Sequence, residues 1–223
     1  GTPAKKVKVW KPEQIAKYRV NHKKLYLAIL GEVYDVSKGR GYYGTEDGYG
    51  GFCGRDGSRA FSTGQFTEEG LIDDLSGLTL QQIHGIVDWR DFYRDHEKYK
   101  YKGVLVGRYY TETGDETEEL KKLEKDVDSY KAFLKRMEEE RKQYENCNSG
   151  YSDAEGGRVW CPYEKYPRKS IHEAPDGAPK ERCACFTSEE LKRLPELNLQ
   201  ARIELWPNCE EDSRECQTVP PKK

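Results

Sequence analysis

The sequence lacks a long hydrophobic run: its longest apolar stretch is LYLAIL at residues 25–30. A membrane-spanning helix needs about 20 mostly apolar residues, so we expect no transmembrane segment. No signal peptide is visible at the N-terminus, which does not exclude secretion. Hydrophobic residues make up only 35% of the 223 residues, and charged residues make up another 35%. Part of the chain is therefore expected to be solvated helix or loop.

Sequence motifs of common enzyme classes are also missing. There is no P-loop, no dinucleotide fingerprint and no evident pair of nucleophile and base. The four histidines, His22, His84, His96 and His172, are isolated from one another in the sequence. A net charge of −2 argues against a general nucleic-acid binder. We therefore expect neither an enzyme nor a nucleic-acid partner.

The seven cysteines are distributed unevenly. Cys53 stands alone, whereas the other six follow residue 146, namely Cys147, Cys161, Cys183, Cys185, Cys209 and Cys216. An even number of cysteines in a polar tail rich in proline and glycine favours a disulfide framework in an oxidising compartment. Zinc binding is the alternative, but the Cys-x-Cys spacing at 183–185 does not match a zinc knuckle.

Residues 7–112 have the pattern of a small α+β domain. LYLAIL and EVYDV are β-rich runs joined at Gly31, which predicts a hairpin or two adjacent strands. A short helix is expected after Thr67. A firmer helix is expected from Thr79, where TLQQ has the pattern of a capping box, and a closing strand is expected over 103–108.

A charged helix is predicted over residues 113–146. Its apolar residues recur at alternating spacings of three and four, namely Leu120, Leu123, Val127, Tyr130, Leu134, Met137 and Tyr144. This spacing fits a coiled-coil seam and equally an amphipathic helix packed on its own domain. Residues 147–223 contain too few aliphatic side chains for a large core, so disulfides are expected to order an otherwise irregular tail.

The glycine-rich stretch RGYYGTEDGYGGFCGRDGSRAFSTG, residues 40–64, contains Tyr42, Tyr43 and Tyr49. A long loop inside a compact domain is usually functional or disordered. A tyrosine can stack, donate a hydrogen bond or, as a phenolate, bind ferric haem iron. The bland alternative is that these tyrosines only anchor the loop on its domain.

These residues carry a family resemblance. The stretch LYLAILGEVYDVSKGRGYYGTEDGYGGFCGRDGSRAFSTG, followed by DDLSGLT and a helix with a tryptophan, resembles the haem-binding domain of the membrane-associated progesterone receptor family, a branch of the cytochrome b5-like proteins. The tail pattern RVWC, APKERCACF and two later cysteines resembles the secreted or lumenal branch of that family. The resemblance implies a cytochrome b5-like haem-binding domain followed by the long charged helix and the disulfide-rich tail.

The resemblance also implies site residues. Tyr49 matches the tyrosine whose phenolate binds the iron of ferric haem b, and Tyr43 matches a second tyrosine that supports the pocket. A Lys-Tyr pair before the last strand lines the family's pocket. The repeat KYKYK offers two pairs, and we favour Lys100 and Tyr101 over Lys98-Tyr99 because they lie closer to the closing strand.

The implied function is that of a non-enzymatic haem-binding protein, secreted or in the secretory lumen, which promotes neuronal differentiation through an unknown receptor. A haem-stacked or coiled-coil homodimer is a further expectation. The alternative is a haem-independent adaptor that binds a protein through the long helix and the disulfide tail. Asp56 is expected to hold its own turn, and Trp89 and Phe92 are expected in the core rather than in a cofactor wall.

Overall fold

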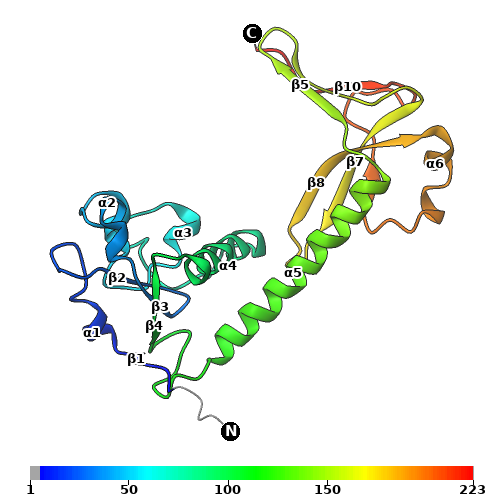
Figure 1. Cartoon of the computed structure of the whole chain (residues 1–223). Coiled ribbons are helices and arrows are strands. Elements are labelled where there is room, and N and C mark those ends of the chain that lie inside the picture. The colour runs from blue at the N-terminus through cyan, green and yellow to red at the C-terminus, as the bar shows by residue number, and fades with distance from the viewer. Residues whose placement is uncertain (1–5, 223) are drawn as a thin grey trace. The chain divides into compact units, whose positions relative to one another are not determined.

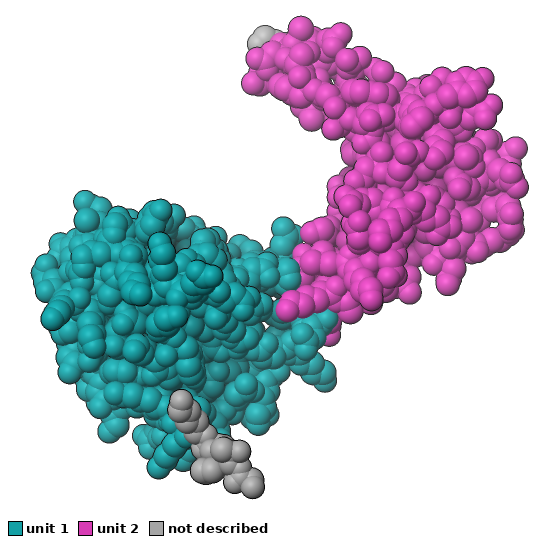
Figure 2. All heavy atoms as spheres, viewed as in Figure 1, with its two compact units in different colours: residues 1–128 teal, residues 129–223 magenta. Residues whose placement is uncertain are grey.

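The computed structural model describes residues 6–222. These residues form two compact units, the first ending at Asp128 and the second starting at Ser129 (Figure 2). The domain boundaries expected at residues 112 and 146 stay predictions. Each unit is described by itself below.

The first unit is built on one four-stranded sheet with the order β1-β4-β3-β2. Its strands are β1 (Val9–Trp10), β2 (Tyr26–Ile29), β3 (Glu32–Asp35) and β4 (Lys100–Leu105). β1 runs parallel to β4, and the other neighbours are antiparallel. The predicted hairpin is confirmed, because β2 and β3 pair antiparallel across Leu30 and Gly31.

The turn of this hairpin is held by the GRDGSR segment. Leu30 and Gly31 have φ angles of +47° and +76°, as a two-residue hairpin turn with two positive φ angles requires. The Leu30 N–H donates to Ser58 Oγ at 2.7 Å, and the Gly31 N–H donates to Asp56 Oδ2 at 2.8 Å. Asp56 Oδ1 also accepts from the Ser58 N–H at 3.0 Å, which confirms that Asp56 holds its own turn.

Short helical segments surround the sheet, and among residues 6–128 one long helix lies wholly within this unit (Figure 1). They are α1 (Pro12–Ile15), η1 (Ser37–Gly39), α2 (Arg40–Tyr43), η2 (Gly48–Phe52), α3 (Ala60–Thr63) and α4 (Leu80–Asp95). α4 begins at the predicted capping box, in which the Thr79 hydroxyl accepts from the Gln82 N–H. The helix predicted after Thr67 is only a single turn, because the chain then bends to pair Ile72 O with the Arg59 N–H.

The core of the first unit contains aliphatic and aromatic side chains from the sheet and α4. Leu25, Leu27, Ile29 and Ile86 are fully buried in it. Apolar burial contributes roughly 25 cal/mol per Å², so a core of this kind can stabilise the unit without a covalent link. The only cysteine here, Cys53, is buried and free.

α5 (Glu118–Gln143) is the long helix predicted from the charged repeat. Leu120, Leu123 and Val127 lie in the core of the first unit, and Tyr130 and Phe133 are buried in the second. This burial matches the amphipathic-helix alternative. A coiled-coil homodimer through the same stripe would require these side chains to leave their present packing.

Within residues 6–222, no helix is both long enough and apolar enough to cross a membrane.

The second unit contains two three-stranded sheets. One has the order β10-β6-β5 and the other has the order β8-β7-β9. The elements are β5 (Asn148–Ser152), β6 (Gly156–Trp160), β7 (Lys165–Glu173), β8 (Pro179–Thr187), α6 (Ser188–Lys192), η3 (Leu194–Glu196), β9 (Arg202–Glu204) and β10 (Glu215–Val219). The tail is therefore less irregular than its composition predicts, because backbone pairing between β7 and β8 needs few aliphatic side chains.

Three disulfide bonds form in this unit, as the cysteine count predicts, and two of them link one sheet to the other. The pairs are Cys147–Cys183, Cys161–Cys185 and Cys209–Cys216. The structure thus favours the disulfide alternative over zinc. Cys147, Cys161 and Cys185 do converge within 4.8 Å of one another, but each is bonded in a disulfide.

Candidate functional site

The glycine-rich loop folds closely onto the first unit, and two of its glycines are required by close contacts. A Cβ on Gly50 would lie 1.5 Å from Thr45 O, and one on Gly44 would lie 2.4 Å from Arg40 O. Only glycine permits such approaches of the backbone. These contacts fix η2 and α2, and thereby the positions of Tyr49 and Tyr43.

An aromatic cavity of about 510 Å³ lies beside these two segments. We call it the aromatic slot. Its lining residues are Tyr42, Tyr43, Tyr49, Phe52, Ala60, Phe61, Ser62, Thr63, Gly64, Phe66, Trp89, Phe92, Tyr93, His96 and Tyr99. The volume is within the range of about 300–1,000 Å³ typical of cofactor sites.

The rings around the aromatic slot form a closed series of contacts. Ring centroids lie 4.2–6.4 Å apart along the series Tyr49, Phe52, Phe61, Trp89, Phe92, Tyr99, Tyr43 and back to Tyr49. Apart from the closer Phe52–Phe61 pair, at 4.2 Å, these separations match the spacing of paired aromatic side chains, roughly 4.5–7 Å. The arrangement presents apolar ring surfaces that suit a flat, largely apolar ligand.

Most slot tyrosines are buried phenols. The hydroxyls of Tyr43 and Tyr93 share a hydrogen bond of 2.6 Å. Burial raises the pKa of Tyr43 to about 12, although the hydrogen bond to Tyr93 acts to lower it. Burial also raises the pKa of Tyr93 and of Tyr99. These three side chains therefore remain neutral hydroxyl groups at physiological pH.

Tyr49 differs from these buried tyrosines because 50% of it is exposed. Its ring contacts Phe66 at 5.7 Å and Phe52 at 6.3 Å. No hydrogen bond to its hydroxyl is found among residues 6–222. The Tyr49 oxygen is thus available to a ligand in the aromatic slot.

The favoured Lys-Tyr pair, Lys100 and Tyr101, is not among the residues that line the aromatic slot. Lys100 Nζ donates to Glu97 O at 2.7 Å. Tyr101 pairs with Tyr34 in the β3–β4 ladder and contacts its ring at 5.9 Å. Tyr99, from the alternative pair, lines the slot instead. Tyr99 precedes β4, so the strand does not set the direction of its side chain. Tyr101 lies within β4, where the pleat determines the sheet face to which its side chain points.

Trp89 and Phe92 line the aromatic slot rather than the core, which corrects a second expectation. They are 44% and 43% exposed. α4 buries Ile86 and Val87 on one face and presents Trp89 and Phe92 to the slot, and His96, directly after the helix, also lines it. Helical spacing places these positions together but does not reveal which face of the helix meets the core.

His96 is a slot residue that the sequence reasoning missed. Its ring stacks on Tyr99 with a centroid separation of 4.0 Å. The available signal was its spacing of four residues from Phe92 and seven from Trp89 on one helix. An isolated histidine without a ligand motif gave no reason to use that spacing.

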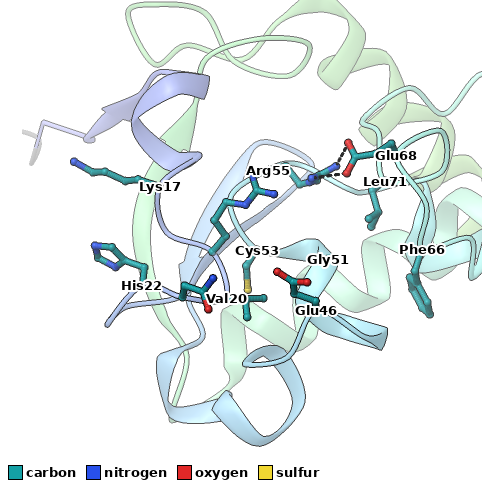
Figure 3. A pocket seen from close by; sticks show the side chains of 13 residues that line it. Lys17, Val20, His22, Glu46, Gly51, Cys53, Arg55, Phe66, Glu68 and Leu71 are labelled. Carbon is teal, nitrogen blue, oxygen red and sulfur yellow. Dashed lines mark hydrogen bonds and ion pairs between the residues drawn. The ribbon is translucent and has the colours of Figure 1, made fainter.

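A second cleft, of about 640 Å³, shares η2 and Phe66 with the aromatic slot (Figure 3). Its lining is polar: Arg55 forms a bidentate pair with Glu68 at 2.9 and 3.0 Å, and no tyrosine lines it. Cys53 lies within it, where burial raises the pKa of its thiol to about 12. A neutral thiol and paired charges suit a haem less well than the tyrosines of the slot.

Comparisons with known proteins identify a family. A family model described as a cytochrome b5-like haem/steroid binding domain matches residues 11–110. The chain is 37% identical over 214 residues to membrane-associated progesterone-binding protein 4 of Arabidopsis thaliana, across 94% of this chain and 84% of that protein. It is 39% identical over 209 residues to the neuferricin of Danio rerio, across 89% and 76%.

Two further comparisons cover shorter stretches. The neuferricin of Mus musculus is 41% identical over 161 residues, which is 71% of this chain and 60% of that protein. A solved structure from Arabidopsis thaliana, described as a hypothetical protein with a cytochrome b5-like fold, is 30% identical with a TM-score of 0.40, over 48% of this chain and 98% of that one.

The relatives with long matches extend through both units, including the cysteine-bearing tail, so the family predicted from the sequence is confirmed. The chain belongs to the family of the neuferricins and the membrane-associated progesterone-binding proteins, and it carries a cytochrome b5-like haem/steroid-binding domain.

Proposed function

We propose that this chain binds ferric haem b in the aromatic slot and that the Tyr49 phenolate is the axial ligand of the iron. The observation that carries the proposal is the position of Tyr49. It is half-exposed at an aromatic cavity, and within the described chain no hydrogen bond occupies its hydroxyl. The neighbouring tyrosines Tyr43 and Tyr93 are engaged with each other.

The residues of the aromatic slot fit this cofactor. A haem would supply a ferric ion whose positive charge stabilises a phenolate at neutral pH. Phe52, Phe61 and Trp89 provide apolar surface for the macrocycle. Tyr99 is a neutral phenol that can donate a hydrogen bond toward the ligand oxygen, and Tyr43 can do the same while it accepts from Tyr93. Such partners commonly tune a metal ligand. In this proposal Tyr99 replaces Lys100 and Tyr101.

A tyrosinate ligand favours the ferric state and lowers the reduction potential, so the proposed role is binding rather than electron transfer or catalysis. One haem face would remain open. A haem-stacked homodimer through that face is part of the proposal, supported by the exposed rings of Tyr42 and Phe92 near the slot.

The proposed location is the secretory lumen or the extracellular space. Three disulfides in the second unit support it, because such bonds persist mainly in oxidising compartments. The promotion of neuronal differentiation through a receptor stays a prediction. Its test is to apply purified wild-type and Tyr49→Phe protein to neural progenitor cells and to count the differentiated cells.

The first experiment is a hemin titration followed by absorption spectroscopy, with Tyr49→Phe beside wild type. We expect a one-to-one Soret shift with high-spin ferric features in wild type, and its loss in Tyr49→Phe. Tyr101→Phe is the matched control, because Tyr101 is outside the slot lining, and it should bind like wild type.

A spectrum of free hemin with all three proteins would overturn the haem proposal. The aromatic slot would then be a structural feature. The haem-independent adaptor, acting through α5 and the disulfide-linked unit, would become the leading function, and deletion of 115–145 would be its next test.

A further inference from the structure

His96 is the only basic side chain in the lining of the aromatic slot. The other lining residues are aromatic, small or hydroxyl-bearing, and none is Lys or Arg. A haem carries two propionate carboxylates, and buried anionic oxygens require hydrogen-bond donors. The slot offers hydroxyl donors from its tyrosines, Ser62 and Thr63, and His96 is the one nitrogen base among its lining residues.

The His96 ring is held in place from two sides. It stacks on Tyr99 with a centroid separation of 4.0 Å and an interplanar angle of 16°. It also contacts the Phe92 ring edge-on at 5.0 Å. His96 is the C-cap residue of α4, so the helix end fixes its backbone as well. A side chain restrained in this way loses little entropy when it binds a ligand.

A backbone hydrogen bond selects the tautomer of His96. The Lys98 N–H donates to His96 Nδ1 at 3.1 Å. Nδ1 is therefore the acceptor nitrogen, and in a neutral imidazole the proton then lies on Nε2. Iron ligation through Nε2 would require that proton to move to Nδ1, where it would face the Lys98 N–H. The hydrogen bond thus disfavours His96 as an iron ligand and prepares Nε2–H as a donor.

We propose that His96 is a hydrogen-bond donor of the aromatic slot, which gives its Nε2–H to an anionic oxygen of the bound ligand. Two sources of that oxygen share this chemistry: a haem propionate, and a small oxygen anion held beside the iron, for which fluoride serves as the probe. The inference rests on the proposed haem function. It assigns His96 a positioning role that retains the cofactor or its small-molecule ligand.

The test is the rate of hemin release to excess apomyoglobin from wild type, His96→Phe and His96→Gln. Phenylalanine keeps the stacking on Tyr99 but removes the donor, whereas glutamine keeps an N–H donor. A hydrogen bond to a charged group contributes about 1.5–3 kcal/mol. If the acceptor is a propionate, we therefore expect His96→Phe to release hemin at least about tenfold faster than wild type. The release rate of His96→Gln should stay within about threefold of wild type. Thermal unfolding of each variant checks that the fold is retained.

Two further arms distinguish the sources of the oxygen. With hemin dimethyl ester, whose propionates are blocked, wild type and His96→Phe should release the porphyrin at equal rates if the acceptor is a propionate. If the acceptor is an anion on the iron, His96→Phe should instead weaken fluoride binding to the ferric protein about tenfold. Lys98→Ala keeps the backbone N–H and should behave like wild type in both arms.

Equal hemin release and equal fluoride affinity in wild type and His96→Phe would overturn the inference while leaving the haem proposal intact. A low-spin six-coordinate spectrum that becomes high-spin in His96→Phe would also overturn it, because His96 would then be a ligand. Absence of any Soret shift in wild type would overturn the haem proposal itself.

Discussion

The two units of this chain obtain their order in different ways. The first unit, up to Asp128, buries a large cluster that includes Leu27, Ile29 and Ile86, and its one cysteine is free. The second unit has a small cluster around Tyr144 and Phe186 and three disulfides. The first unit thus depends on apolar burial, and the second depends on strand pairing and covalent links.

This difference places the candidate site in the unit that needs no oxidising environment. The aromatic slot is formed by side chains from η2, α3 and α4 that pack against the apolar core. From this contrast we expect that conditions which unfold one unit leave the other unit folded. The three predictions below test that independence.

The largest effect is expected on reduction of the disulfides. By the loop-entropy relation, the Cys161–Cys185 bond, with a sequence separation of 24, contributes about 3.5 kcal/mol, and Cys209–Cys216, with a separation of 7, contributes about 2.5 kcal/mol. A mild reductant should therefore unfold the second unit while the first keeps its hemin spectrum. Hydrogen exchange with mass spectrometry reads both units in one sample.

A paired variant sharpens this test. Replacing Cys161 and Cys185 with serine should reduce exchange protection in β6 and β8 more than replacing Cys209 and Cys216 does. Equal loss of protection in the first unit would contradict the contrast, because that unit contains no disulfide.

A smaller effect, on the stability of the first unit instead of the second, is expected from Ile86→Ala. Ile86 is fully buried on α4, and truncation of such a side chain costs about 2–5 kcal/mol. The free energy of unfolding should fall in the first unit, and hemin affinity should fall with it because α4 carries Trp89 and Phe92. Ile72→Ala is the control, since Ile72 is 37% exposed. Protection lost from β7 and β8 would show that the units are coupled.

The smallest effect is a pH dependence confined to the second unit. Burial acts to raise the pKa of Glu140, but hydrogen bonds from His172 at 3.2 Å and Arg182 at 2.9 Å outweigh it and hold that pKa below its ordinary value. The folded state then binds fewer protons than the unfolded state. This contribution is complete above pH about 4.3 and is lost as pH falls through the folded pKa.

Urea unfolding between pH 7 and pH 3.5 measures this dependence. Glu140→Gln should flatten the acid decrease for the second unit, whereas Glu139→Gln, at the exposed neighbouring position, should leave it unchanged. An identical acid profile for wild type and Glu140→Gln would rule out this carboxylate as the cause.

The parts of the fold that could be predicted are those set by residues close together in the sequence. The hairpin at Gly31 and the capping box at Thr79 were confirmed because each is fixed by residues a few positions apart. The helix after Thr67 shortened to a single turn because a distant partner, the Arg59 N–H, engages Ile72 O. The sheets of the second unit escaped prediction for a similar reason, since their order depends on pairing across long separations.

The same division applies to the site. The family, the glycine-rich loop with Tyr43 and Tyr49, and the tail of six cysteines could all be recognised before the fold was known, because motif residues and their spacing are local. Three features became visible in the folded chain alone: Tyr99 lines the slot in place of Tyr101, Trp89 and Phe92 face the slot, and His96 joins them. Contacts between segments far apart in the sequence determine which face of α4 meets the core. They also determine the residue at which β4 begins.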